Sequence, residues 1–389
     1  MKKRLFDRVV DFIHVGYFGW KLQFDIDLED SKRFLYSIKE PRDDIDRAYA
    51  QYKCQCYLRR KMATVLLNIA CAFGIIPYII KGMLGKVVHK DNKDIVYSIS
   101  IIDKRIIPPS LRAKYDSEYI TNEYDGVLLK KEDLGFIWKL YRRYPFSFFF
   151  ILRIILKISF YRYFIEEYHP KAIAINSEFS CTSAVMTMYC EQMGITHINI
   201  MHGEKMFYIR DSFFRFSECY VWDNFYVELF KFLRVPDGQF VVDKPESLII
   251  DIEKYKGSQQ AVDYKYMLNG NEKIDVISES LHKLKKMGFV VMVRPHPTYT
   301  DTDLLKQYFS EDEIENCKVS IEESISNTSF VISLYSTVLL QAYMSGINIV
   351  MDDVNYKREY QKLKDLKYIL INKPHQLLSE VLSGNTEKQ

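Results

Sequence analysis

Neither sign of charge dominates this sequence, and that absence narrows the classes of protein it can belong to. The 389 residues carry 54 Lys and Arg against 51 Asp and Glu, a net charge of +3. A nucleic-acid-binding domain usually shows a clear basic excess, so a general nucleic-acid binder is disfavoured. Hydrophobic residues make up 48% and charged residues 27%, which is ordinary for a folded globular protein.

Several familiar catalytic signatures are missing. The sequence has no Gly-rich dinucleotide fingerprint, no Walker phosphate loop and no Gly-x-Ser-x-Gly nucleophile elbow. The commonest dehydrogenase, ATPase and hydrolase functions are therefore excluded, and no cofactor is expected. A metal site is not predicted either, because Asp352 and Asp353 have no third ligand at a suitable spacing.

Disulfides and a secretion signal are also not expected. The seven cysteines are odd in number and scattered, which favours reduced thiols in the cytosol. The stretch Met1 to Trp20 is basic but interrupted by Asp7 and Asp11, and it lacks the apolar core and cleavage site of a signal peptide. We therefore expect a cytoplasmic protein.

Two apolar segments suggest a membrane surface. Met62 to Ile80 carries no charged side chain and has about the length of a short span, but Gly74 and Pro77 interrupt it, which favours a buried helix. Phe136 to Phe164 mixes aromatic and basic residues, which suits a lipid headgroup interface or, equally, a core helix with basic ends in solvent. We expect both segments to place one face of the protein against the inner side of the cell membrane without crossing it.

The order of predicted elements indicates an α/β fold. Residues 1–90 are expected to be helical, Ile95 to Ile102 forms a strand, and Phe136 to Tyr168 is helical with a break near Pro145. Strands then alternate with helices; they are predicted at Ala172–Asn176, Thr196–Met201, Glu218–Trp222, Ser247–Asp251, Phe289–Val293, Phe330–Leu334 and Ile347–Met351. This order implies parallel strands with right-handed crossovers. We expect two Rossmann-like lobes facing a central cleft, residues 1–235 with a helical N-terminal region and residues 236–389.

Polar motifs follow five of these strands and carry the functional signal. They are Asn176-Ser177-Glu178, His202-Gly203-Glu204, Asp223, Arg294-Pro295-His296-Pro297 and Ser333-Leu334-Tyr335-Ser336-Thr337. In open α/β sheets, ligands bind at the carboxyl ends of the strands. The sequence therefore predicts an enzyme with a polar ligand.

Two of the motifs suit a phosphate. The prolines around His296 stiffen the turn, Arg294 offers a planar fork for an anion, and His296 is a hydrogen-bond donor or a general acid. Ser336 stands where a helix N-cap belongs, and the same geometry gives a phosphate site at a helix N-terminus. Because these groups stabilise a leaving phosphate, no divalent metal is expected.

The acids at the other strand ends are candidates for a general base. Glu178, Glu204 and Asp223 each follow a strand, and each of them taken alone is better explained as a helix cap or a solvated loop acid than as a catalyst. We expect one of them to take the proton from an acceptor hydroxyl, and the sequence does not rank Glu178 against Glu204. Gly203 allows a close approach of the backbone to a ligand.

The order of these motifs resembles bacterial surface-polysaccharide glycosyltransferases of the GT-B type, above all the sialyltransferases, polysialyltransferases and Kdo transferases, which use CMP-activated sugars. That resemblance implies that His296-Pro297 and Ser336-Thr337 contact the donor nucleotide, and that Glu178 or Glu204 is the base. It implies transfer of a 2-keto acid sugar from a CMP donor to a glycan or lipid-linked glycan. The Asp/Glu-Asp/Glu-Gly element of the sialyltransferases is not intact here.

A second resemblance is to the CDP-glycerol and CDP-ribitol polymerases of teichoic-acid synthesis. It is carried by His202-Gly203 and by Arg294 to Pro297, but the aspartate of their Asp-Tyr-Ser-Ser motif is missing here, because Leu334 precedes Tyr335 in Ser333-Leu334-Tyr335-Ser336-Thr337. A polyol phosphotransferase is therefore the alternative enzyme. A non-catalytic subunit that binds nucleotide sugars in a polysaccharide assembly complex is the alternative from another class.

Overall fold

The computed structural model describes residues 21–99, 103–122, 126–258, 260–270 and 272–384. The chain forms two compact units, residues 1–202 with 207–244, and residues 203–206 with 245–389. The sequence placed the division after residue 235. The basic stretch Met1 to Trp20, the end of the strand predicted at Ile95–Ile102 and the polar tail after Gly384 lie outside the described residues.

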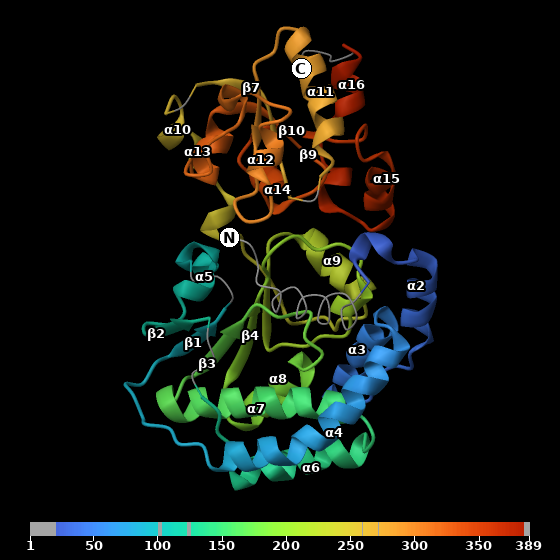
Figure 1. Cartoon of the computed structure of the whole chain (residues 1–389). Coiled ribbons are helices and arrows are strands. Elements are labelled where there is room, and N and C mark those ends of the chain that lie inside the picture. The colour runs from blue at the N-terminus through green and yellow to red at the C-terminus, as the bar shows by residue number, and fades with distance from the viewer. Residues whose placement is uncertain (1–20, 100–102, 123–125, 259, 271, 385–389) are drawn as a thin grey trace. The chain divides into compact units, whose positions relative to one another are not determined.

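The first unit contains a parallel six-stranded sheet (Figure 1). Its strands are β1 (Ile95–Ser98), β2 (Glu118–Thr121), β3 (Ala172–Ile175), β4 (Thr196–Ile200), β5 (Glu218–Val221) and β6 (Phe240–Val242), in the order β2-β1-β3-β4-β5-β6. The chain moves from β1 to β2 on one side and then returns to β3 on the other. The strand order therefore reverses between β1 and β3. The sequence did not predict β2 or β6.

The described part of the first unit also contains helices, and those between Leu28 and Met83 lie in the region 1–90 that the sequence predicted to be helical. The helices are α2 (Leu28–Ser37), α3 (Asp44–Leu58), α4 (Lys61–Met83), α5 (Pro109–Arg112), α6 (Lys131–Arg143), α7 (Phe148–Tyr168), α8 (Ser183–Gln192) and α9 (Asn224–Phe232). The break near Pro145 falls between α6 and α7. Short 3-10 turns occur at Gln23–Asp25, Lys104–Ile106 and Ile209–Asp211.

The two apolar helices α4 and α7 have opposite surroundings, and both expectations for them need correction. No residue of α7 is exposed, and Arg162 near its end is buried in an ion pair with Asp133 at 2.6 Å. The segment Phe136 to Phe164 thus contains a core helix, and α7 is not a headgroup surface. By contrast, α4, predicted as a buried helix, buries only Ala63 and Gly82. Among the described residues, it is the one helix long and apolar enough to cross a membrane.

The second unit contains a parallel five-stranded sheet in the order β11-β10-β9-β7-β8. Its strands are β7 (Val262–Met267), β8 (Val291–Arg294), β9 (Thr328–Ser333), β10 (Asn348–Met351) and β11 (Gln376–Leu377). The expected strand at Ser247–Asp251 was wrong, because that stretch begins with a 3-10 turn at Glu246–Leu248; the first strand of the unit is β7. The order again reverses, here between β7 and β9.

The helices of the second unit are α10 (Ile252–Tyr255), α11 (Ile274–Lys286), α12 (Thr302–Leu305), α13 (Ile321–Ser326), α14 (Thr337–Met344), α15 (Lys357–Asp365) and α16 (Leu378–Leu382), with 3-10 turns at Glu311–Glu313 and Ile369–Asn372. Leu281 of α11 packs with Tyr266, Val293, Ile332 and Val350 of four strands in one buried core. The expected fold class, α/β with two Rossmann-like units, is confirmed.

Candidate functional site

The reversal between β7 and β9 places the candidate site of the second unit. In open α/β sheets, a ligand binds outside the carboxyl ends of the strands where the order reverses. The loops that start there follow β7, β8 and β9, and two of them contain the predicted motifs around His296 and Ser336. The topology therefore gathers, at one edge, motifs that lie about forty residues apart in the chain.

His296 is held in one orientation by its own loop. Its Nδ1 accepts hydrogen bonds from the backbone N–H groups of Thr298 at 3.2 Å and Tyr299 at 3.3 Å, and its ring stacks on Tyr299 with centroids 4.6 Å apart. Its own N–H donates to the Thr300 hydroxyl at 2.8 Å. A nitrogen that accepts two N–H groups carries no proton, so the neutral ring holds its proton on Nε2. The side chain is thus arranged as a hydrogen-bond donor, whereas the sequence left open a general acid. Pro297, next in the loop, is exposed.

Ser336 is the N-cap of α14, as the sequence predicted. Its Oγ accepts from the backbone N–H of Leu339 at 3.1 Å. The first N–H groups of a helix have no partner within the helix and point toward its N-terminus, where they favour an anion. Thr337 begins α14 and is partly exposed. Ser333 differs: it is 1% exposed, and its hydroxyl donates to the Met267 carbonyl at 3.2 Å, so it joins β9 to β7 instead of facing a ligand.

The loop after β7 belongs to the site and was missed in the sequence. Asn269 Nδ2 donates to the Tyr335 carbonyl at 2.9 Å, and Glu272 accepts from the backbone N–H of Gly270 at 2.7 Å. Gly270 has φ +101°, and a Cβ there would lie 2.2 Å from the Cβ of Tyr299. Only glycine fits such a position. These contacts fix the three loops to one another, and the Asn-Gly pair after an alternating apolar run was the available signal.

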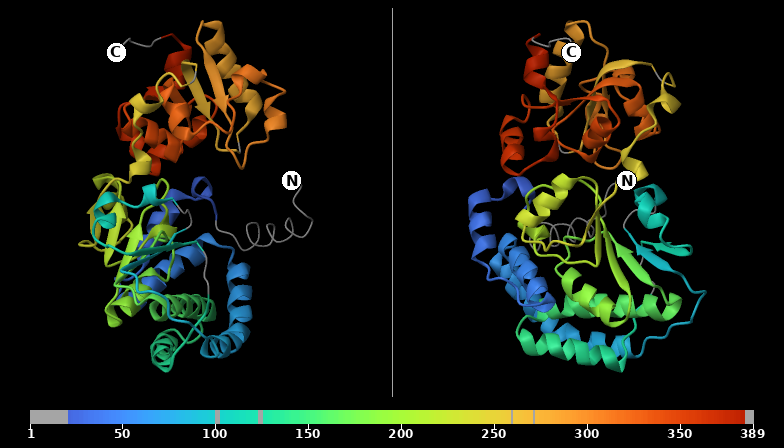
Figure 2. Two further views of the ribbon diagram at one scale, coloured as in Figure 1. Left: turned by 90° about the vertical axis from the view of Figure 1, so that its left-hand side faces the viewer. Right: turned by 180° about the vertical axis from the view of Figure 1, so that it is seen from behind.

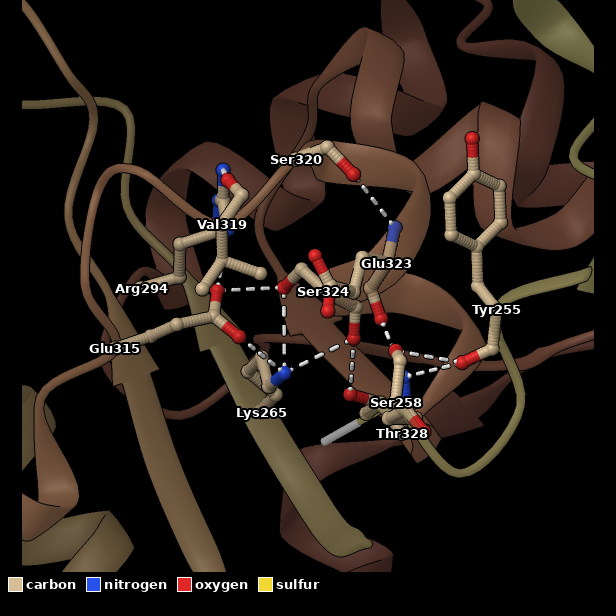
Figure 3. A network of polar contacts seen from close by, with 11 residues as sticks. Tyr255, Ser258, Lys265, Arg294, Glu315, Val319, Ser320, Glu323, Ser324 and Thr328 are labelled. Atoms are coloured by element: carbon tan, nitrogen blue, oxygen red, sulfur yellow. Dashed lines mark hydrogen bonds and ion pairs between the residues drawn. The ribbon is translucent and has the colours of Figure 1, made fainter. Parts of the chain in front are cut away.

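Arg294 has a different role from the one the sequence gave it. Its guanidinium pairs with Glu315 and donates to the Val319 carbonyl at 2.9 Å, and the residue is 9% exposed. Glu315 also accepts from the Lys265 ammonium at 2.6 Å and from the Ser324 hydroxyl at 2.6 Å, as Figure 3 shows. The Arg294 guanidinium, which was predicted to bind the anion of a ligand, is already paired with the carboxylate of Glu315. We therefore assign Arg294 to the support of the loop that begins at Pro295.

This network carries two cations and one carboxylate in the protein interior. Lys265 is 1% exposed and also donates to the Ser324 carbonyl at 2.9 Å. Burial raises the pKa of Glu315, but the Lys265 charge and the hydrogen bonds from Lys265, Ser324 and Arg294 outweigh it and lower the pKa overall. The carboxylate is thus ionised. Burial also lowers the pKa of Lys265, although the charge of Glu315 and its hydrogen bond oppose this shift. Arg294 is the last residue of β8, so its guanidinium lies directly before the loop that begins at Pro295 and contains His296.

The acids of the first unit are largely occupied by its own structure. Glu178 is fully buried after β3, and its Oε2 accepts from Asn199 Nδ2 at 3.3 Å, while its carbonyl accepts from Gln51 at 2.9 Å. Asp223 is the N-cap of α9 and accepts from the backbone N–H of Phe225 at 2.8 Å. For Asp223, the capping explanation offered by the sequence fits what the structure shows.

The stretch after β4 contains the remaining predicted residues. His202 is half-buried, and Gly203 has φ +69°, a left-handed conformation that favours glycine. Glu204 groups with the second unit and is half-buried. Burial raises the pKa of Tyr368, the Glu204 charge adds to that rise, and the backbone of Ser336 opposes it. Glu204 is therefore near Tyr368, which is itself near the N-terminus of α14.

The Asp352-Asp353 pair is used internally. Asp352 is fully buried and accepts from the Tyr266 hydroxyl at 2.6 Å, and Asp353 accepts from the Ser379 hydroxyl at 2.6 Å. Within the part of the chain that the structure describes, no group of three or more His, Cys, Asp or Glu side chains is placed to hold a metal ion.

Comparisons with known proteins give fold likenesses only. No protein-family model matches the sequence, and no curated protein matches it. The wall teichoic acid polymerase TagF is 10% identical, with 83% of this chain and 89% of that chain covered and a TM-score of 0.46. The glycotransferase of kitacinnamycin is 8% identical, with 76% of this chain and 92% of that chain covered and a TM-score of 0.43. TarM is 11% identical over 55% of this chain, which spans 46% of TarM, with a TM-score of 0.35. At these identities the likeness concerns the fold, and no substrate follows from it.

Proposed function

We propose that this protein is a glycosyltransferase that binds a nucleotide-activated sugar at the carboxyl edge of the second sheet. One observation carries the proposal: the Nε2 donor of His296 and the capped N-terminus of α14 belong to loops at the edge where the strand order reverses. Both are neutral donors suited to a phosphate. The resemblance of His296-Pro297 and Ser336-Thr337 to the CMP-sugar enzymes makes CMP the proposed nucleotide, with a 2-keto acid sugar such as sialic acid or Kdo as the group transferred.

The proposed chemistry places negative charge on the leaving phosphate. His296 donates its Nε2 proton in a hydrogen bond to a phosphate oxygen, and the first N–H groups of α14 donate to the same anion. The Lys265–Arg294–Glu315 network holds the Arg294 guanidinium in place behind the His296 loop. Because these groups are held in place before the reaction, they need little rearrangement as charge develops.

For the acceptor base we rank Glu204 first. It is half-buried and groups with the unit that holds the donor motifs, whereas Glu178 is fully buried and accepts from Asn199, and Asp223 caps α9. A base must reach the hydroxyl from which it takes a proton. The acceptor in this proposal is a glycan or lipid-linked glycan at the inner face of the cell membrane.

A thermal-shift series with CMP, CDP, UDP, GDP and ADP tests the nucleotide. A ligand that binds only the folded state raises the melting temperature, so CMP or CDP should give the largest shift. His296→Ala should reduce that shift, and His282→Ala, an exposed histidine on α11, should leave it unchanged. A larger shift with UDP or GDP would reject the CMP assignment, and no shift with any nucleotide would reject the donor site itself.

A further inference from the structure

The outward face of α4 is apolar over its whole length. Its exposed large side chains are Met62 at 61%, Val65 at 50%, Leu66 at 44%, Ile69 at 52%, Phe73 at 79%, Ile76 at 67%, Ile80 at 55% and Met83 at 40%. They recur at intervals of three and four residues, which places them on one side of a helix. A surface helix of a soluble protein normally has the opposite pattern, with polar residues outward. We call these residues the α4 face.

The other side of α4 is fixed to the first unit. Asn68 donates to the Phe146 carbonyl at 2.8 Å and accepts from the Phe149 backbone N–H at 3.0 Å, both beside the start of α7. Nearly three turns further on, Tyr78 shares a 2.7 Å hydrogen bond with Ser159 of α7. The carbonyl of Gly82 accepts from the Leu129 N–H at 2.9 Å. These contacts span most of the helix, so α4 lies along α7 as part of the folded unit.

That attachment decides between crossing a membrane and lying on it. A spanning helix is surrounded by lipid or by other spanning helices. By contrast, α7, to which α4 is bound, is a core helix of the first unit, and its Phe164 and Tyr168 pack with Val96 of β1. Crossing would have to break the Asn68 and Tyr78 hydrogen bonds. With them intact, only the α4 face is available to the hydrocarbon.

The charges and aromatic residues around the α4 face match an anionic membrane. From Arg59 to Lys90 the chain contains no acidic residue, and exposed Lys61, Lys81 and Lys86 flank the apolar strip. Phe146, whose carbonyl binds Asn68, is 79% exposed, and α6, which carries Trp138 at 58% exposure, lies beside α4 at the same end of the unit in Figures 1 and 2. Basic and aromatic residues around an apolar strip are typical of an interfacial helix.

We propose that the α4 face is a docking surface for an anionic lipid bilayer, in which α4 lies parallel to the membrane plane with its apolar side chains inserted below the headgroups. The flanking lysines contact anionic headgroups. This inference does not rest on the proposed nucleotide site, since it uses only residues of the first unit.

Vesicle co-sedimentation of the full chain tests this surface. Wild-type protein should sediment with phosphatidylglycerol-containing vesicles and less with pure phosphatidylcholine, and high salt should weaken binding. The double variant Phe73→Asn/Ile76→Asn should lose at least tenfold in partition, because the two side chains that it makes polar are among the most exposed of the α4 face. Ile249→Asn, which changes a 54% exposed isoleucine of the second unit, is the matched control and should bind as wild type.

Four outcomes would overturn the proposal. Wild-type binding to neither vesicle would show that the face meets no bilayer, and a dimer that the double variant abolishes would assign it to a second copy of the chain. Equal binding by a folded double variant, checked by circular dichroism, would place the contact elsewhere. Retention in membranes after carbonate extraction would contradict the in-plane geometry. Nucleotide thermal shifts on the same variants should be unchanged, which separates this test from that of the donor site.

Discussion

The two sheets have the same reversal of strand order but present different carboxyl edges. In the first unit, the acid after β3 is fully buried, and the acid after β5 caps the next helix. In the second unit, the loops after β7, β8 and β9 keep His296, Ser336 and Thr337 partly exposed and join one another through Asn269 and Gly270. Topology brings polar residues to an edge in both units, but hydrogen-bond partners decide which of them remain available to a ligand.

The sharpest test of that difference compares the two glutamates. Glu204→Gln should lower transfer by about 10²–10⁴-fold while nucleotide binding persists, because a base acts mainly in the transition state. Glu178→Gln should change the melting temperature more than the rate, since this side chain is buried against Asn199. Turnover with a CMP-sugar and thermal melting of both variants measure the two effects. Normal transfer by Glu204→Gln and loss of transfer by a stable Glu178→Gln would reverse the ranking.

The buried network of the second unit should give the largest effect on stability. Glu315→Ala leaves Lys265 and Arg294 without their shared carboxylate, and loss of one partner of a buried ion pair costs roughly 3–5 kcal/mol of unfolding free energy. Glu311→Ala, which removes a carboxylate 88% exposed, is the control and should change little. Urea denaturation measures both. A loss below about 1 kcal/mol for Glu315→Ala would mean that the network is not a structural support.

The same carboxyl group predicts the acid limit of the second unit. The pKa of Glu315 is lower in the folded protein than its ordinary value of 4.5. A carboxyl group with a depressed folded pKa contributes stability that is full above the unfolded pKa and is lost as pH falls through the folded one. Wild-type protein should therefore lose stability below about pH 4.5, and Glu315→Gln should flatten that part of the profile. An unchanged acid profile in the variant would assign the loss to other carboxyl groups.

His296 tests the donor edge directly. His296→Ala should lower turnover by about 10²-fold, the range expected when a single preorganised hydrogen-bond donor is removed. His296→Gln places an amide donor in the same loop and should recover part of the rate, which a purely structural role in the turn would not predict. A bell-shaped pH dependence that disappears in the Gln variant would instead identify His296 as a general acid.

The smallest expected effect concerns the cap of α14. Ser336→Ala should destabilise the protein by about 1 kcal/mol through loss of the hydrogen bond to Leu339, and it should also weaken nucleotide binding. Ser320→Ala removes the equivalent cap of α13, where Ser320 accepts from Glu323, and should destabilise by a similar amount without affecting the nucleotide. Equal nucleotide affinity in the two variants would show that Ser336 caps α14 and does not contact the nucleotide.

Much of the second half of the fold could be predicted from local pattern. Short apolar runs that end in polar residues marked β3, β4, β5, β8, β9 and β10 to within a few residues, because strands buried on both faces read as continuous apolar stretches. β7 was missed because Lys265 and Asp263 interrupt its apolar pattern. Lys265 is tolerated there only through Glu315, fifty residues later, and no local pattern reveals such a partner.

The sequence predicted which residues lie at the site better than it predicted what each of them does. The strand-end positions of His296 and Ser336 follow from the sequence, but the orientation of His296 depends on the N–H groups of Thr298 and Tyr299. The assignment of Arg294 failed because its anion comes from a distant part of the same chain. The contrast between α4 and α7 has the same cause: both are apolar, and only tertiary packing decides which one is enclosed.

The burial of Lys265 in an inner strand of its sheet has a consequence for synthesis of the chain. β7 is the first strand of the second unit to be synthesised. The groups that accept hydrogen bonds from the Lys265 ammonium, Glu315 and Ser324, follow 50 and 59 residues later. Until the ribosome has released them, burial of β7 would enclose an uncompensated charge. Stable burial of β7 therefore has to wait until Glu315 and Ser324 have been synthesised, so this strand packs late although it is made early.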